Sequence, residues 1–210
     1  MLSPIIGGNK RGEMSPLQAM ERAYAALKGS LREGVYSPGH RLEANRIAET
    51  LGVSMTPVRD ALNRLVGERL VESSGGEGFH VPRLSEGDLR DLYEWHSALI
   101  VMAVRTSQNL PSAEQIDEAM ASGSIAAATS ASFALLAQST PNGELRAAIL
   151  NADDRLHPFR RLEGSVLGSL TEELSSLILH APGQGMAIRR YHLARMRAVP
   201  ALVRLRAARK

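Results

Sequence analysis

The feature that most constrains this chain of 210 residues is a glycine corner between two short helical patterns. Residues 44–51 carry apolar side chains at helical spacing, and Gly52 follows them where a left-handed residue would close a helix. The second pattern starts almost at once, because Thr56 suits the N-cap, Pro57 suits the first helical position, and residues 58–65 continue an apolar face. Two short helices joined by a tight turn with glycine predict a helix-turn-helix.

The second of these helices carries polar side chains that suit a nucleic acid. Arg59 and Asn63 lie one turn apart, on the side away from Val58 and Leu65. A long cation and an amide near the positive end of a helix can meet phosphates and base edges in a major groove. The alternative is the solvated face of a small helical domain, and the pattern favours DNA over that alternative.

The composition favours helix and excludes several classes of site. Hydrophobic residues make up 44% of the chain and aromatic residues only 4%, with many Ala and Leu. The absence of Cys removes disulfides, thiolate nucleophiles and Cys-ligated zinc. No apolar run reaches the roughly 18 residues of a membrane helix, and residues 1–12 lack the apolar core of a signal peptide. We therefore expect a cytoplasmic protein with no membrane partner.

The segments around the glycine corner complete a winged helix. Residues 1–16 have no period and are expected to form a flexible arm, whereas residues 17–31 show one helical face. Strand-like runs at 69–73 and 78–82 flank a glycine-rich tip and predict a hairpin. Because its glycines carry no side chains, this wing can approach phosphates closely. His80 could add a contact, and its alternative is an ordinary exposed strand residue.

Residues 17–83 resemble the winged-helix domain of the gluconate-repressor (GntR) family of bacterial transcription regulators. The resemblance rests on a long ordered string of Gly34, Pro38-Gly39, Arg41-Leu42, Ile47-Ala48-Glu49, Leu51-Gly52-Val53-Ser54, Thr56-Pro57-Val58-Arg59, Ala61-Leu62, Leu65, Leu70-Val71 and Gly78 to Val81. It implies a regulator that binds a palindromic operator in double-stranded DNA as a homodimer.

The resemblance also implies which residues contact the DNA. Carried over by position, the contacts fall on Arg46, Ser54, Thr56, Arg59 and Gly78. An Arg that the family usually has before Thr-Pro is replaced by Met55, which cannot bond guanine or phosphate. The loss of one bidentate contact is on the order of 1–3 kcal/mol, so this protein should read a different base step or bind more weakly.

The second half of the chain, residues 84–210, predicts an all-helical bundle for effector binding and dimerisation. Ser85 and Asp88 have capping-box spacing at the start of a helix. Its apolar face is Leu89, Leu92, Tyr93, His96, Leu99, Ile100 and Ala103. Further helices are separated near residues 109–111, 122–124, 141–143 and 182–185, and no strand pattern appears.

This half resembles, less strongly, the helical ligand-binding (FCD) domain of the fatty-acid-regulator (FadR) branch of the same family. That branch often holds a divalent metal through one Asp and three His, with a small carboxylate effector above it. Here the corresponding positions are Thr129, Phe133 and Leu174, and only His192 matches. The ligand positions are therefore largely lost, no cofactor is assigned, and a metal is the less favoured interpretation.

His96 and His192 are the candidates for contact with an acidic effector. His96 takes the place where the family commonly has an effector-facing Arg, and its alternative is a satisfied core histidine. Asp153 and His157, four residues apart, could chelate a metal. For these two residues and His180, surface or cap positions are the favoured interpretation.

The chain after Glu173 has no acidic residue, so its end is predicted to be a basic arm or helix. Its cations are Arg189, Arg190, Arg195, Arg197, Arg204, Arg206, Arg209 and Lys210. They could touch DNA phosphates or a partner subunit, or the segment could be a solvated terminal helix.

The leading hypothesis is a DNA-binding transcriptional regulator and not an enzyme. One alternative is a metal-dependent enzyme that uses Asp153, His157 and His192. Another is a winged helix used only for protein contacts.

Overall fold

The computed structural model describes residues 15–74, 76, 78–109, 111–178 and 184–209. The expected flexible arm falls almost wholly outside these residues. The first helix, α1 (Pro16–Arg32), begins where the sequence indicates. Its start is a capping box, in which the Ser15 hydroxyl accepts from the Gln18 amide and the Gln18 side chain accepts from the Ser15 amide. Of its predicted apolar face Leu27 and Leu31 are buried, whereas Leu17 is exposed.

The helix-turn-helix consists of α2 (Ala44–Leu51) and α3 (Met55–Gly67). Gly52 closes α2 in the left-handed conformation, with φ of 64°, as the glycine corner predicted. The predicted start of α3 was wrong by two residues: Ser54 takes the N-cap position and Thr56 lies within the first turn. The buried face of α3 is Pro57, Val58, Ala61, Leu62 and Leu65.

The wing belongs to a three-stranded antiparallel sheet with the order β1-β3-β2. The strands are β1 (Arg41–Leu42), β2 (Glu72–Ser74) and β3 (Gly78–His80). The hairpin of β2 and β3 was predicted, whereas β1 was missed. Leu42 lies opposite Phe79, and both pack on the apolar core formed by α1, α2 and α3.

The second half is helical throughout its described residues, in agreement with the predicted fold class. Its helices are α4 (Glu86–Arg105), α5 (Ala113–Met120), α6 (Ile125–Gln138), α7 (Gly143–Glu163), α8 (Leu170–Ile178) and α9 (Gln184–Ala208). The capping box of Ser85 and Asp88 is present, and all seven predicted apolar positions of α4 are buried. None of the helices in the described ranges is both long enough and apolar enough to cross a membrane.

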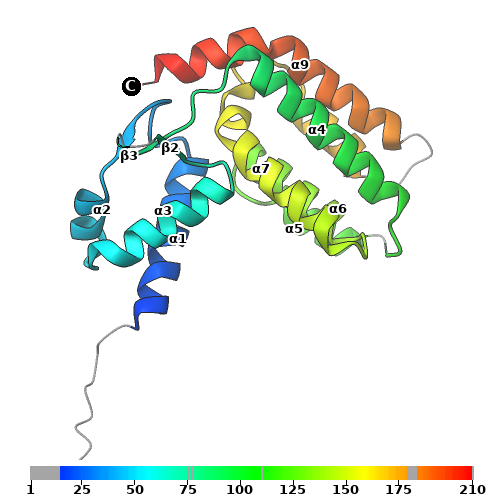
Figure 1. Cartoon of the computed structure of the whole chain (residues 1–210). Coiled ribbons are helices and arrows are strands. Elements are labelled where there is room, and N and C mark those ends of the chain that lie inside the picture. Colours follow the sequence, from blue (N-terminus) through cyan, green and yellow to red (C-terminus); the bar gives the residue numbers. More distant parts are fainter. Residues whose placement is uncertain (1–14, 75, 77, 110, 179–183, 210) are drawn as a thin grey trace, which may run out of the picture.

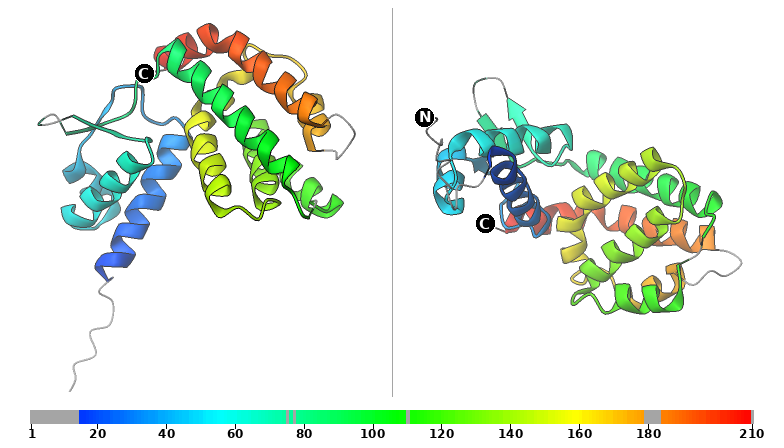
Figure 2. Two further views of the ribbon diagram at one scale, coloured as in Figure 1. Left: turned by 45° about the vertical axis from the view of Figure 1, so that its right-hand side comes forward. Right: turned by 90° about the horizontal axis from the view of Figure 1, so that it is seen from below.

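Two elements join the halves of the molecule (Figure 1). Helix α1 lies beside α7, where Lys28 forms an ion pair with Asp154 at 2.7 Å. Next to this pair, Asn151 of α7 donates at 2.8 Å to the carbonyl of Glu68, the C-cap residue of α3. The C-terminal end of α9 returns to the winged helix, as the views in Figure 2 also show, and Arg206 donates to the Tyr36 carbonyl there.

These contacts correct two predictions about charged residues. Asp153 and His157 are buried and not surface or cap groups, because Arg160 pairs with Asp153 and Ser130 bonds to His157. The basic segment is not a solvated arm either. Helix α9 packs along α4, and the buried Arg195 pairs with Glu163 at 3.0 Å. His180 lies outside the described residues.

Candidate nucleic-acid interface

One face of α3 presents polar side chains away from the core. Met55, Arg59 and Asn63 are spaced by four residues and all three are exposed, so they form one stripe along the helix. Ser54 and Thr56 are exposed beside the start of this stripe. Within the described part of the chain, Arg59 takes part in no ion pair. The stripe therefore places a cation and an amide on the exposed face of α3.

Arg46 lies on α2, with its side chain 77% exposed. It forms an ion pair with Glu43 at 2.9 Å, which an exposed arginine can exchange for a phosphate at small cost. Glu43 takes the N-cap position of α2, so this pair lies where that helix begins. Arg46 is thus exposed near the start of α2, where Glu43 competes with any phosphate for its guanidinium.

A shallow groove runs between the first turns of α2 and α3 and the wing. It is lined by Arg41, Glu43, Asn45, Met55, Arg59 and Gly78, together with neighbouring apolar atoms. Arg41 and Asn45 were not among the predicted contacts. Arg41 lies in a strand of two residues, which is too short to show a period, although Arg41-Leu42 belongs to the string that carries the family resemblance. The groove brings Arg41 and Arg59 to one surface.

The wing approaches this groove through Gly78. Gly78 has φ of 89°, a conformation that side chains other than glycine rarely adopt, and a Cβ atom there would lie 3.8 Å from Arg41 Nε. His80 is half-buried in the middle strand, opposite Arg41 on one side and Glu72 on the other. Because directly opposed side chains share a face of the sheet, His80 lies on the face of Arg41.

Helix α3 is held firmly against α1 on its other side. Arg64 stacks over the Tyr24 ring at 3.8 Å and pairs with Glu21 at 2.9 Å, while the Tyr24 hydroxyl donates to Glu68 at 2.7 Å. Burial of Tyr24 raises its pKa. Arg64 is therefore bound to residues of α1, and these contacts fix the position of α3 and of its exposed stripe.

The two histidines proposed to meet an effector lie together in the bundle. His96 and His192 are fully buried, with 2.8 Å between His96 Nδ1 and His192 Nε2. His192 Nδ1 lies 2.7 Å from the Ile188 carbonyl, which can only accept, so Nδ1 carries the proton and Nε2 accepts from His96. Burial lowers the pKa of both imidazoles, to about 3 for His192. His96 Nε2 is then an acceptor without a partner among the described residues.

Three more buried polar atoms around Phe133 are without a hydrogen bond to the described part of the protein: Arg160 Nε, Arg160 Nη2 and Tyr191 Oη. The Phe133 ring lies 4.7 Å from His96, 5.4 Å from Tyr191 and 5.1 Å from the Arg160 guanidinium carbon. Burial raises the pKa of Tyr191 to about 12, and Arg160 opposes that rise. The centre of the bundle therefore combines unpaired donors with an unpaired acceptor.

This centre does not fit a divalent metal. Across the ranges that the structure describes, no three His, Cys, Asp or Glu side chains come together as ligands. Asp153 and His157 contact Arg160 and Ser130, whereas His192 contacts His96, so the trio of the enzyme hypothesis is not assembled. The guanidinium of Arg160, packed against Phe133, supplies a positive charge instead.

Comparisons with known proteins agree with this geometry. Residues 19–81 match the family model of bacterial regulatory proteins of the gntR family. McbR, a transcriptional regulator of Escherichia coli K12, is 32% identical over 113 residues, 51% of either chain. The Nta operon regulator of Aminobacter aminovorans is 40% identical over 70 residues, 33% of either chain. The chain thus spans about half or less of the length of these curated relatives.

Solved structures extend the similarity to the fold of almost the whole chain. A GntR protein from Rhodococcus sp. RHA1 has a TM-score of 0.72 at 17% identity, covering 87% of this chain and 97% of that one. McbR of E. coli has a TM-score of 0.60 at 20% identity, covering 92% and 99%. Residues 19–81 therefore form a winged helix that matches the family model of bacterial regulatory proteins of the gntR family, and the helices after it are arranged as in these two structures.

Proposed function

We propose that the protein is a transcriptional regulator that binds a palindromic operator through the groove between α2, α3 and the wing. The observation that carries this proposal is the exposed stripe of Met55, Arg59 and Asn63, with Arg41 and Gly78 in the same groove. The relatives named above are transcriptional regulators, and GlaR of E. coli, 30% identical over 81 residues, is named a repressor. Repression is accordingly the mode of regulation that we propose.

Each residue has a role that follows from its chemistry. Arg59 and Asn63 face base edges, since arginine pairs with guanine and asparagine with adenine in the major groove. Arg46, Ser54 and Thr56 hold phosphates near the helix starts, while the wing tracks the backbone through Gly78 and His80. Met55 supplies an apolar contact, which suits a thymine methyl group.

The test begins with selection of duplexes from a random library by the full-length protein. The selected duplex and a scrambled duplex are then titrated by fluorescence anisotropy at two salt concentrations. We expect the selected duplex to bind more tightly and both affinities to fall with salt. Arg59→Ala should weaken specific binding by about 1–3 kcal/mol, whereas Arg90→Ala, an exposed arginine on α4, should not.

Affinity that ignores both sequence and salt would refute DNA recognition. If Arg59→Ala left operator binding unchanged, it would refute the proposed reading face. A winged helix used only for protein contacts would give the first of these results, so the same titration decides between the two hypotheses.

The proposed homodimer forms through the outer face of α4. Trp95, Ala98 and Met102 are spaced by three and four residues and all are exposed, with Trp95 and Met102 each 53% exposed. Exposed aromatic and methionine side chains at helical spacing are typical of a face that packs on another protein. A two-fold axis through this face relates the two winged helices, as a palindromic operator requires.

The bundle is proposed to bind a small hydroxycarboxylate, in keeping with the FadR/FCD branch but without its metal. Arg160 uses Nη1 for Asp153 and Ser130, which leaves Nε and Nη2, the two donors of one guanidinium edge, for a carboxylate. His96 Nε2 is an acceptor and suits the hydroxyl of such an effector. His192 holds His96 in this tautomer through their hydrogen bond.

Tyr191→Phe separates effector binding from stability. Among the described residues, the only polar group that the Tyr191 hydroxyl meets is the Arg160 guanidinium, so removal of the hydroxyl should lower the free energy of unfolding by no more than about 1 kcal/mol. Calorimetric titration with lactate as the probe should show binding to the unmodified protein and weaker binding to Tyr191→Phe. Equal binding of lactate and lactamide would refute recognition of a carboxylate, and DNA binding is measured separately.

A further inference from the structure

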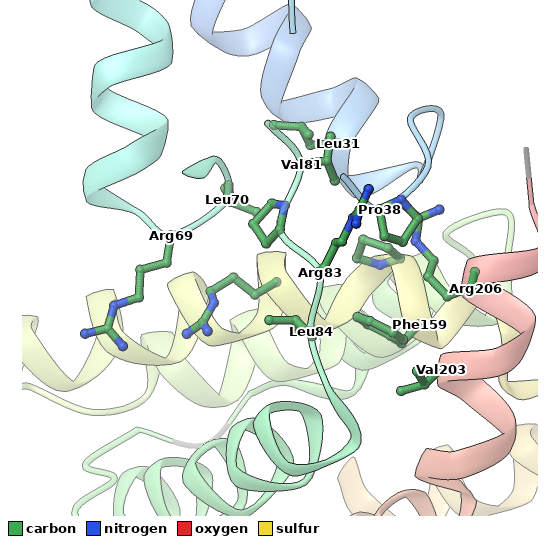
Figure 3. Close-up of a pocket in the computed structure, with 14 residues that line it drawn as sticks. Leu31, Pro38, Arg69, Leu70, Val81, Arg83, Leu84, Phe159, Val203 and Arg206 are labelled. Atoms are coloured by element: carbon green, nitrogen blue, oxygen red, sulfur yellow. The ribbon is translucent and has the colours of Figure 1, made fainter. Parts of the chain in front are cut away.

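A cavity lies between the winged helix and the bundle, away from the bundle centre (Figure 3). Its volume is about 340 Å³. The winged helix contributes Leu31, Pro38 and Leu70, the bundle contributes Phe159 and Val203, and Leu84 comes from the segment between them. A ligand in this cavity would touch both halves of the molecule.

The cavity is apolar in its walls and cationic around them. Four arginines line it, Arg69, Arg83, Arg155 and Arg206, and none of its lining residues is acidic. Arg69 and Arg83 are exposed, Arg155 is half-buried and Arg206 is buried. Glu72, Asp88 and Asp91 line only the adjoining hollow, which shares Arg69, Arg83 and Arg155 with this cavity. Positive charges concentrated beside an apolar surface favour a negatively charged ligand.

Two of these arginines lie close enough to affect one another. Burial and then the charge of Arg69 lower the pKa of Arg155, while Asp88 opposes this change. Asp88 is engaged by the Ser85 amide at 2.8 Å and the Ser85 hydroxyl at 2.6 Å. Arg206, in contrast, already donates to the carbonyls of Tyr36 and Gly34. Arg69, Arg83 and Arg155 are therefore the cations that remain for a ligand, and of these Arg69 and Arg155 lie close together.

The backbone keeps Arg69 and Arg83 at this junction. Arg69 follows the C-terminal end of α3 in the left-handed conformation, with φ of 57°, and its amide donates to the Val66 carbonyl at 2.9 Å. Arg83 covers Gly39, where a Cβ atom would lie only 1.9 Å from Arg83 Nε. The arginines thus belong to the elements that connect the reading helix and the wing to the bundle.

We propose that this cavity binds a monocarboxylate with an apolar body, whose acid group lies between Arg69 and Arg155 and whose body fills the space beside Leu84, Phe159 and Val203. Its volume is at the lower end of the ~300–1,000 Å³ range of ligand pockets, which suits one small molecule. Because the ligand contacts both halves, it stabilises the conformation in which the winged helix and the bundle are in contact, relative to conformations in which they separate. This site is distinct from the effector site that we propose at the bundle centre.

The test uses the full-length protein and two pairs of probes: octanoate with octanamide, and benzoate with benzamide. Calorimetry should show one carboxylate bound per chain, and the matching amide should bind at least about tenfold more weakly because it lacks the charge. Arg69→Gln and Arg155→Gln should each weaken carboxylate binding about tenfold. Arg90→Gln, a matched exposed arginine outside the cavity, should leave it unchanged.

Tyr191→Phe distinguishes this cavity from the bundle centre, because Tyr191 does not line it. Carboxylate binding that survives Tyr191→Phe and falls in both arginine variants supports the proposal. Absence of carboxylate binding, equal binding of the amides, or unchanged binding in Arg69→Gln and Arg155→Gln would overturn it. None of these outcomes depends on the DNA titration, so the proposed function is tested separately.

Discussion

Acid should destabilise this protein through its buried histidines. Burial is the main cause that lowers the pKa of His192 to about 3 and that of His157 to about 4, and it also lowers the pKa of His96. The ordinary value, about 6.5, applies to the unfolded chain. The stability that these neutral imidazoles contribute is complete above pH 6.5 and is lost as the pH falls toward their folded pKa values.

The magnitude follows from the difference between the two states. At pH 5 the unfolded chain protonates each imidazole while folded His157 and His192 remain neutral, which costs about 2 kcal/mol per residue, or roughly 4 kcal/mol for the two. His96 acts in the same direction. Asp154 acts in the opposite direction, because burial raises its pKa and protonation then favours the folded state.

Urea unfolding at pH 7.5 and pH 5, followed by far-ultraviolet circular dichroism, measures this loss. His192→Gln removes one titrating group, so its pH-dependent loss should be about 2 kcal/mol smaller than that of the unmodified protein. Tyr191→Phe alters the same part of the core without removing an imidazole and should retain the full loss. The reasoning is refuted if the unmodified protein loses less than about 1 kcal/mol or if His192→Gln retains the whole loss.

Three further predictions concern the glycine turns, the contact between the halves and the proposed dimer. Gly39→Ala should lower the free energy of unfolding by more than the ~1–2 kcal/mol of left-handed strain, because its Cβ must also displace Arg83. Gly52→Ala, which meets no atom within 4 Å, should show the strain alone in the same urea titration. Lys28→Met removes the ion pairs of Lys28 with Asp154 and Glu68 and should cost about 1–3 kcal/mol by urea unfolding. Trp95→Glu should convert the dimer to a monomer in light scattering after size-exclusion chromatography, and a dimer that persists would exclude this face.

Local sequence signals predicted the elements with local causes. Gly52 closes α2 because a left-handed residue is needed there. Ser85 and Asp88 start α4 because the side chain of each accepts a hydrogen bond from the backbone amide of the other. Strand β1 was missed because two residues cannot show an alternating pattern, and its pairing with His80 spans half of the N-terminal domain. The exposed positions of Arg59 and Asn63 followed from helical periodicity alone.

Charged residues could not be placed in the same way, because their partners are distant in the sequence. The exposed or buried state of Asp154 depends on Lys28 and Arg32, which lie in the first helix. Arg195 is buried because Glu163 lies against it, and the cationic composition of the C-terminal segment gives no indication of this pairing. Asp153 and Arg160, which form a buried ion pair, are an exception, because they lie seven residues apart on one helix and that spacing is two turns.

Helix α7 connects the proposed effector site to the DNA-binding domain through contacts within a few turns. Arg160 presents its unpaired edge to the bundle centre, one turn from His157, whose Nε2 lies 3.5 Å from Glu33, the C-cap residue of α1. Asp154, one turn earlier on α7, forms an ion pair with Lys28 of α1. Because α1 packs along the reading helix α3, a shift of α7 on effector binding reaches the DNA interface through one intervening helix. The coupling that we expect therefore requires the ionic contact between α1 and α7, and neutralising Asp154 should reduce the effect of lactate on operator affinity more than it reduces either binding alone.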